Sequence, residues 1–186
     1  MRLTPIKTPK AVSGLFPNYV WNIKSNDKVI YLTFDDGPTP EITDWTLDIL
    51  KKYNAKATFF CIGNNVEKHP AIFKRIISKE HAIGNHTHNH IKGWRTETDA
   101  YIENTEKASE YIASKLFRPP YGQIRPKQGK ALMQLNYKII MWSVLSFDWE
   151  KSVSKEECYQ NIINNTTSGD IIVSVSYTHL TLPTKA

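Results

Sequence analysis

The amino-acid sequence predicts an α/β fold in which parallel strands form a (β/α) barrel. Segments rich in β-branched and aromatic residues alternate with helical segments six times along the 186 residues, and this alternation favours parallel strands joined by helical crossovers. The most reactive side chains directly follow the strands, at positions that converge on one rim of a barrel. An open, doubly wound sheet would bring only a few of them to its switch point.

The first expected strand covers residues 29–34. It is β-rich and ends at Asp35-Asp36-Gly37-Pro38, which is a turn signal. Over residues 41–53 the apolar side chains fall on roughly one helical face, so a helix is expected there. The largely apolar run at 57–62 is expected to form the second strand.

The middle of the chain repeats the alternation. Residues 66–80 carry apolar side chains with helical spacing, and 82–85 form a short strand that runs into a histidine cluster. The longest helical stretch is expected over 96–116, where threonine and aspartate near the start are plausible capping residues. A brief strand at 117–118 is stopped by two prolines.

Two helices and two strands are expected over residues 126–173. A helix over 126–136 has proline at its start, where the missing N–H costs little. Residues 138–144 are expected to form the fifth strand, 154–165 a helix, and 170–173 the sixth strand.

Residues 1–28 are expected to wrap the barrel as an irregular N-terminal arm, since they contain three prolines and a glycine. The arm lacks the uninterrupted apolar segment of a signal peptide. No stretch of the chain approaches the 18 or more apolar residues of a membrane span. The expectation is a protein without an export signal, which is cytoplasmic by default.

Charge and cysteine content exclude several classes of protein. The net charge is +6, with a pI of about 9.2, but the lysines and arginines are scattered and a nucleic-acid partner is not expected. The two cysteines lie far apart, which excludes a disulfide scaffold and a cysteine zinc site. A monomer with one hydrophobic core is expected.

Two clusters carry the candidate chemistry. Asp35 and Asp36 can divide their roles, one as a metal ligand and the other as a free base. His86 and His90 could chelate one ion on a helical turn, whereas an extended segment would place His88 on the same side, so the role of His88 stays open. Two histidines and one carboxylate leave an open coordination position, which is typical of a catalytic zinc site. The alternative is a surface loop with incidental imidazoles.

A third segment follows the brief fourth strand. Arg118 could orient a carboxylate through two hydrogen bonds. The backbone around Tyr121-Gly122 could direct an N–H at an oxyanion. The alternative is a structural loop with a surface arginine.

These segments together resemble the first three motifs of the polysaccharide deacetylases, the NodB-homology domains of carbohydrate esterase family four. The segments are Thr33-Phe34-Asp35-Asp36-Gly37-Pro38, His86-Thr87-x-x-His90 and Arg118-Pro119-Pro120-Tyr121-Gly122. The resemblance covers roughly residues 29–173, and it places the deacetylase domain at 29–174. It implies a distorted (β/α) barrel and a metal-dependent hydrolase that removes N-acetyl groups from N-acetylglucosamine polymers such as peptidoglycan or chitin.

The resemblance also implies a role for each site residue. Asp35 would be the catalytic base, and Asp36, His86 and His90 would bind one divalent metal ion. Arg118 would orient Asp35, and the Tyr121 N–H would help to hold the oxyanion. Zinc is the default ion for this ligand set, although other divalent transition metals also accept it. The expected substrate-binding residues are Pro120, Tyr121, Asp148 and Trp149.

Two departures from the family pattern concern the end of the chain. Leu145 replaces the first acid of the fourth motif, whereas Asp148 and Trp149 match, and Trp149 could equally be core. Val175 stands where the family has the histidine that acts as general acid. Residues 175–186 resemble nothing further in the family, so a foreign tail and missing closing elements are expected. The alternative function is therefore a catalytically impaired glycan- or metal-binding domain. A third option, a metal phosphoesterase, would need further acidic or histidine ligands for a second ion, and the sequence offers no obvious cluster of them.

Overall fold

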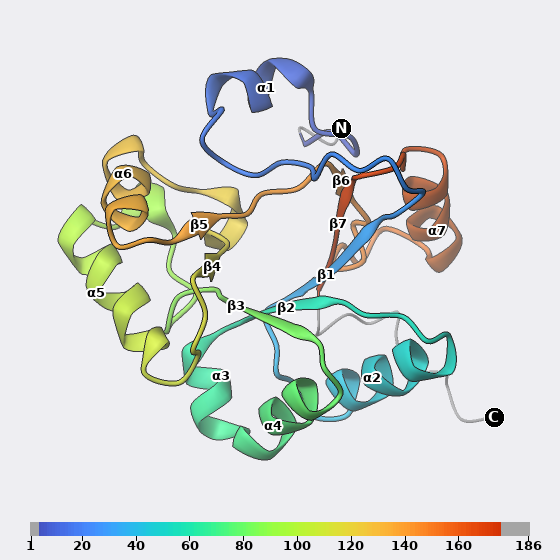
Figure 1. Ribbon diagram of the computed structural model, residues 1–186, viewed down its shortest axis with the longest axis horizontal. Helices are drawn as coiled ribbons and strands as arrows, with labels where there is room; N and C mark the ends of the chain where they lie inside the picture. Colours follow the sequence, from blue (N-terminus) through green and yellow to red (C-terminus); the bar gives the residue numbers. More distant parts are fainter. Residues whose placement is uncertain (1–3, 176–186) are drawn as a thin grey trace.

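The computed structural model describes residues 4–175 of the chain. Seven parallel strands form one curled sheet in the order β5-β4-β3-β2-β1-β7-β6, with the helices on its outer side (Figure 1). The strands are β1 (Tyr31–Asp35), β2 (Thr58–Cys61), β3 (Ala82–Asn85), β4 (Leu116–Phe117), β5 (Lys138–Ile139), β6 (Val144–Leu145) and β7 (Ile171–Val175).

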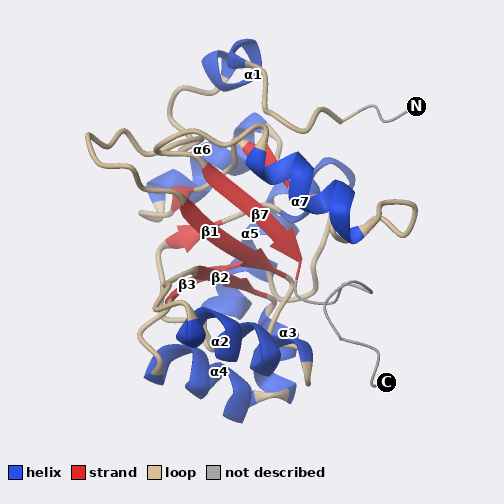
Figure 2. Cartoon of the chain, turned by 90° about the vertical axis from the view of Figure 1, so that its right-hand side faces the viewer, coloured by secondary structure: helices blue, strands red, loops and turns tan. Residues whose placement is uncertain are grey.

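Strand β1 pairs with β2 on one side and with β7 on the other, and its carboxyl end lies level with theirs. Asp35, its last residue, lies opposite Phe60 of β2 and Val175 of β7. Phe59 and Phe60 are almost fully buried, because helices cover the outer face of the sheet and side chains fill its inner face. Side chains that follow β1, β2 and β3 therefore emerge at the same rim (Figure 2).

Seven α-helices occur within residues 4–175, two of them where one was expected. The segment 66–80 is divided into α3 and α4 at His69, because Pro70 lacks the N–H that a continuous helix would need. None of the described helices is long and apolar enough to cross a bilayer. The helices are α1 (Lys10–Leu15), α2 (Ile42–Lys52), α3 (Gly63–Lys68), α4 (Pro70–Ser78), α5 (Thr98–Ser109), α6 (Pro126–Gln134) and α7 (Lys155–Ile163).

The helix expected over 96–116 is shorter, since α5 ends at Ser109. Beyond it the chain turns inward, and Ile112 is fully buried. The Ser114 hydroxyl donates to the Ile83 carbonyl at 2.7 Å, which holds the turn against β3. This turn lets Leu116 and Phe117 start β4 beside β3.

The single strand expected over 138–144 is wrong: two short strands occupy opposite edges of the sheet. β5 pairs with β4, and β6 pairs with β7. The N-terminal arm runs across the gap between them, where Val20 donates to the Ile139 carbonyl at 2.8 Å and Thr8 to the Ser143 carbonyl at 2.9 Å. The arm thus binds backbone groups that an unclosed barrel would leave unpaired.

The arm is more ordered than an irregular segment, because it contains the short helix α1. Tyr19 is buried in the cluster formed with α6 and β5, and its ring stacks on Phe16 with centroids 5.4 Å apart. The expected foreign tail lies, apart from Val175, outside the described residues.

Candidate active site

A cavity of about 390 Å³ opens at the carboxyl ends of the strands. The predicted barrel would bring the reactive side chains together at this rim. Residues from the N-terminal arm, from β1, β6 and β7 themselves, and from the segments after β1, β3, β4, β5 and β6 form its wall. They are Thr4, Asp35, Asp36, His86, His90, Pro119, Tyr121, Gly122, Trp142, Leu145, Phe147, Trp149, Glu150, Val173 and Val175.

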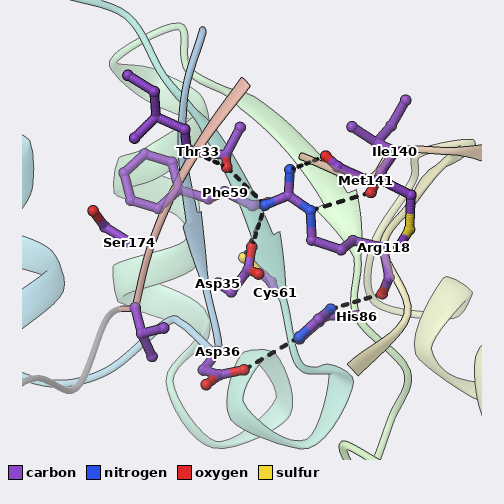
Figure 3. Close-up of polar contacts among 12 residues, drawn as sticks. Thr33, Asp35, Asp36, Phe59, Cys61, His86, Arg118, Ile140, Met141 and Ser174 are labelled. Atoms are coloured by element: carbon purple, nitrogen blue, oxygen red, sulfur yellow. Dashed lines mark hydrogen bonds and ion pairs between the residues drawn. The ribbon is translucent and has the colours of Figure 1, made fainter. Parts of the chain in front are cut away.

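A buried ion pair joins Asp35 to Arg118. The Arg118 Nη1 donates to Asp35 Oδ1 at 2.7 Å and to the Thr33 hydroxyl at 2.7 Å (Figure 3). Arg118 is fully buried, whereas Asp35 faces the cavity. The guanidinium therefore fixes one oxygen of the carboxylate while the cavity gives access to the group.

Backbone carbonyls and an aromatic ring satisfy the rest of the guanidinium. Its Nε donates to the Ile140 carbonyl at 3.2 Å and its Nη2 to the Met141 carbonyl at 3.0 Å. The Phe60 ring lies 4.1 Å from the guanidinium carbon. Burial lowers the pKa of Arg118, and the adjacent Asp35 opposes that shift. The interpretation as a surface arginine is wrong, because the chain between β5 and β6 covers this side chain.

Asp36, His86 and His90 lie together beside this ion pair. Asp36 Oδ1 is 3.3 Å from His86 Nε2 and 3.0 Å from His90 Nε2. One ligand atom from each residue lies within 4.8 Å of the other two. Burial by itself raises the pKa of the Asp36 carboxyl, but the two imidazoles outweigh it and hold that pKa well below its usual range.

The hydrogen bond of His86 leaves one of its ring nitrogens directed at this cluster. His86 Nδ1 lies 2.7 Å from the Arg118 carbonyl oxygen, which can only accept, so Nδ1–H donates (Figure 3). In the neutral ring the Nε2 lone pair then faces Asp36, whose buried Oδ1 has no hydrogen bond of good geometry. A shared cation satisfies converging lone pairs of this kind, and a backbone carbonyl on the other ring nitrogen is typical of metal-binding histidines. The three residues fit a divalent ion.

His88 points away from the cluster. Its ring stacks on Tyr111 with centroids 5.7 Å apart, and its Nε2 lies 3.8 Å from Glu67. The loop is neither the helical turn nor the extended strand that the spacing suggested, because Thr87 and His90 have φ values of 61° and 53°. These left-handed residues turn His86 and His90 toward one point and His88 toward α5.

Four residues of the cavity wall share this uncommon backbone conformation. The φ values are 71° at Asp36, 53° at His90, 59° at Tyr121 and 63° at Phe147. None of them is glycine, so each conformation costs about 1 kcal/mol or more and persists only where the surrounding structure enforces it. Such outliers gather at functional sites.

Sequence reasoning missed Trp142 as a wall residue. A Cβ added to Gly122, whose φ is 67°, would lie 2.5 Å from the Trp142 ring, so the loop after β4 and the indole pack without space between them. Trp149 also lies in the wall, whereas Pro120 and Asp148 are not among the residues that line it. In the sequence, Gly122 indicates that another group packs closely against this loop. It does not indicate that the group is Trp142.

Comparison with known proteins agrees with this geometry. The sequence model of the family described as polysaccharide deacetylase matches residues 22–140, more than half of the chain. The chain belongs to the polysaccharide deacetylase family.

Relatives in this family are similar along most of the chain. A peptidoglycan-N-acetylglucosamine deacetylase of Bacillus cereus is 40% identical over 164 residues, which cover 85% of this chain and 59% of the relative. A chitooligosaccharide deacetylase of Azorhizobium caulinodans is 34% identical over 158 residues, 81% of this chain and 75% of that protein. The chain thus spans less than two thirds of the length of the first relative.

A solved structure confirms the expected fold. The crystal structure of a peptidoglycan N-acetylglucosamine deacetylase bound to a hydroxamate, 4-naphthalen-1-yl-N-oxidanyl-benzamide, has a TM-score of 0.83 and 38% identity. The match covers 90% of this chain and 80% of that one. The curled parallel sheet is the distorted barrel of the polysaccharide deacetylases.

The position at which the family resemblance expects a histidine is buried against Asp148. The Val175 N–H donates to both oxygens of the Asp148 carboxyl, at 3.1 and 3.0 Å, and the Ser146 hydroxyl donates at 2.9 Å. Burial nevertheless raises the pKa of Asp148 to about 7, and these hydrogen bonds reduce the shift. Asp148 therefore holds the end of β7 to the loop after β6.

Proposed function

We propose that the chain is a metal-dependent hydrolase that removes N-acetyl groups from polysaccharide containing N-acetylglucosamine, of the peptidoglycan or chitin type. The observation that carries this proposal is the convergence of Asp36, His86 and His90 beside the Arg118-bound carboxylate of Asp35 in one cavity. The relatives, a peptidoglycan-N-acetylglucosamine deacetylase and a chitooligosaccharide deacetylase, support the substrate class.

Asp36, His86 and His90 would hold one divalent ion, for which zinc is the default. Imidazole nitrogen with carboxylate oxygen is a ligand set that zinc accepts, and three protein ligands are typical of catalytic sites. A bound ion supplies Lewis acidity to the acetyl carbonyl. The carbonyl of Arg118 keeps the ring of His86 in the required tautomer.

Asp35 would act as the base. Amide hydrolysis adds water to the acetyl carbon and breaks the C–N bond, so a proton must leave the water and another must reach the nitrogen. Asp35 can accept the first proton, since Arg118 orients the carboxylate and the cavity gives access to it. Protonated Asp35 can then return this proton to the departing amine, which breaks the C–N bond and leaves Asp35 ionised. The second proton of the water stays on the acetic acid, which gives it to the free amine or to solvent and leaves as acetate.

The cavity wall would hold the reacting group in place. The Tyr121 N–H would donate to the oxyanion that forms at the acetyl carbon. Trp149 offers an aromatic surface to the sugar or the acetyl methyl group, and Trp142 lies on the same wall. Pro120 keeps the loop of Tyr121 rigid, because its φ is fixed.

Acetate release tests the proposal. The protein is incubated with an N-acetylglucosamine pentamer after chelation, and again after stoichiometric zinc is restored. We expect acetate only in the presence of a divalent ion, with one free amine formed for each acetate. A zinc-loaded, folded protein that binds the pentamer but releases no acetate would instead support the impaired glycan-binding domain. Release that chelation leaves unchanged would contradict the metal site.

A further inference from the structure

A lysine lies at the rim of the cavity. Lys92 follows His90 by two positions, and its Nζ is 4.7 Å from the centroid of the Tyr121 ring. Tyr121 lines the cavity, and its ring also packs against His90, with centroids 4.6 Å apart. An aromatic side chain of the wall therefore holds the ammonium group beside the site.

Among the described residues, no carboxylate forms an ion pair with this ammonium group, whereas Lys7, Lys56 and Lys79 each form one. The nearby carboxylates, Asp35 and Asp36, already face Arg118 and the two histidines. The three N–H donors of Lys92 are thus available to an anionic ligand.

The cavity has a negative charge on one side, at Glu150, and a positive charge on the other, at Lys92. Glu150 lines the cavity in the loop after β6, next to Trp149. A carboxylate on a bound ligand would be repelled there and attracted at the Tyr121 side, where Lys92 lies. The two charges would therefore favour one position for an acidic substituent.

We propose that Lys92 determines specificity by binding a carboxylate on the sugar next to the one that is deacetylated. This inference rests on the proposed function, because a glycan has to occupy the cavity. The ligand class is a glycan in which N-acetylglucosamine alternates with an acidic sugar, such as one with a lactyl ether. Partly exposed ion pairs contribute modestly, so the preference should be about threefold to fivefold and should weaken as salt rises.

The test compares one glycan in two forms. A tetrasaccharide of alternating N-acetylglucosamine and N-acetylmuramic acid is used as the free acid and as its methyl ester, which removes the charge and adds one methyl group to each carboxyl. KM and kcat are measured at low and high salt with zinc-loaded wild type, Lys92→Gln and Lys92→Arg. If no glycan is turned over, dissociation constants from tryptophan fluorescence supply the same ratio.

A second lysine provides a matched control. Lys115 Nζ lies 4.3 Å from the centroid of the Tyr137 ring, also without an ion pair in the described chain, but it directly precedes β4 at the opposite end of the barrel. Lys115→Gln removes the same charge from the same kind of contact. It should keep both the activity and the preference of the wild type.

We expect the wild type to favour the acid about threefold to fivefold at low salt, through KM rather than kcat. Lys92→Gln should treat the two forms alike, and Lys92→Arg should restore the preference. Equal affinity of the wild type for acid and ester, or a preference that survives in Lys92→Gln, would overturn the inference. Carboxylate-dependent binding without acetate release would contradict the deacetylase proposal and support the role of Lys92.

Discussion

Asp35→Asn is expected to lower acetate release by roughly 10²–10⁴-fold, the usual contribution of a general base. An amide at this position can still accept the hydrogen bond from Arg118, which keeps the side chain in place. It cannot take a proton from water, so the loss should appear in kcat. Zinc affinity should be retained, because the metal-binding cluster is formed by Asp36, His86 and His90.

Zinc titration of the same variant provides the control. Acetate release is compared with the wild type at equal zinc occupancy and at a temperature where both proteins are folded. A variant that lost zinc would require the roles of Asp35 and Asp36 to be exchanged. Near wild-type turnover would show that another group accepts the proton.

Arg118→Met is expected to destabilise the fold by about 3–5 kcal/mol, the range for removing one partner of a buried ion pair. Arg118 is fully buried and donates to Asp35, to the Thr33 hydroxyl and to two backbone carbonyls between β5 and β6. Methionine fills a similar volume without donors. It would leave a carboxylate and two carbonyls without these partners.

The measurement is the free energy of unfolding in urea. Arg75→Met is the matched control, because Arg75 also pairs with an aspartate, with Nε 2.8 Å from Asp44 Oδ1, but on the exposed surface. It should cost about 1 kcal/mol or less. Equal losses for the two variants would show that the buried network does not hold the β5–β6 crossing in place.

The sequence predicted the parts of the site that depend on the order of strands. Asp35 and Arg118 come directly after β1 and β4, and parallel strands bring their carboxyl ends to the same rim. The alternation of strand and helix therefore predicted that both side chains lie at one rim, and the residue types indicated that Arg118 could orient a carboxylate. That this carboxylate is Asp35 was implied by the family resemblance. The family pattern added a role for each residue, which the variants above test.

Features that depend on local backbone conformation or distant packing could not be predicted. The orientation of His88 depends on left-handed φ values at Thr87 and His90, which no spacing rule reveals. The division of residues 138–144 into two strands depends on the N-terminal arm, whose backbone lies between them. Trp142 reaches the cavity wall through its contact with Gly122, twenty residues earlier in the chain.

Zinc binding by histidine variants tests the central claim most directly. We expect the wild type to bind one zinc ion per chain, with nitrogen and oxygen ligands at about 2.0–2.2 Å by X-ray absorption. His86→Gln and His90→Gln should each lose stoichiometric binding, because each removes one of three converging ligand atoms. His88→Gln should bind zinc like the wild type, since its ring faces Tyr111 and Glu67. Loss of zinc in His88→Gln, or full binding in His90→Gln, would contradict the account.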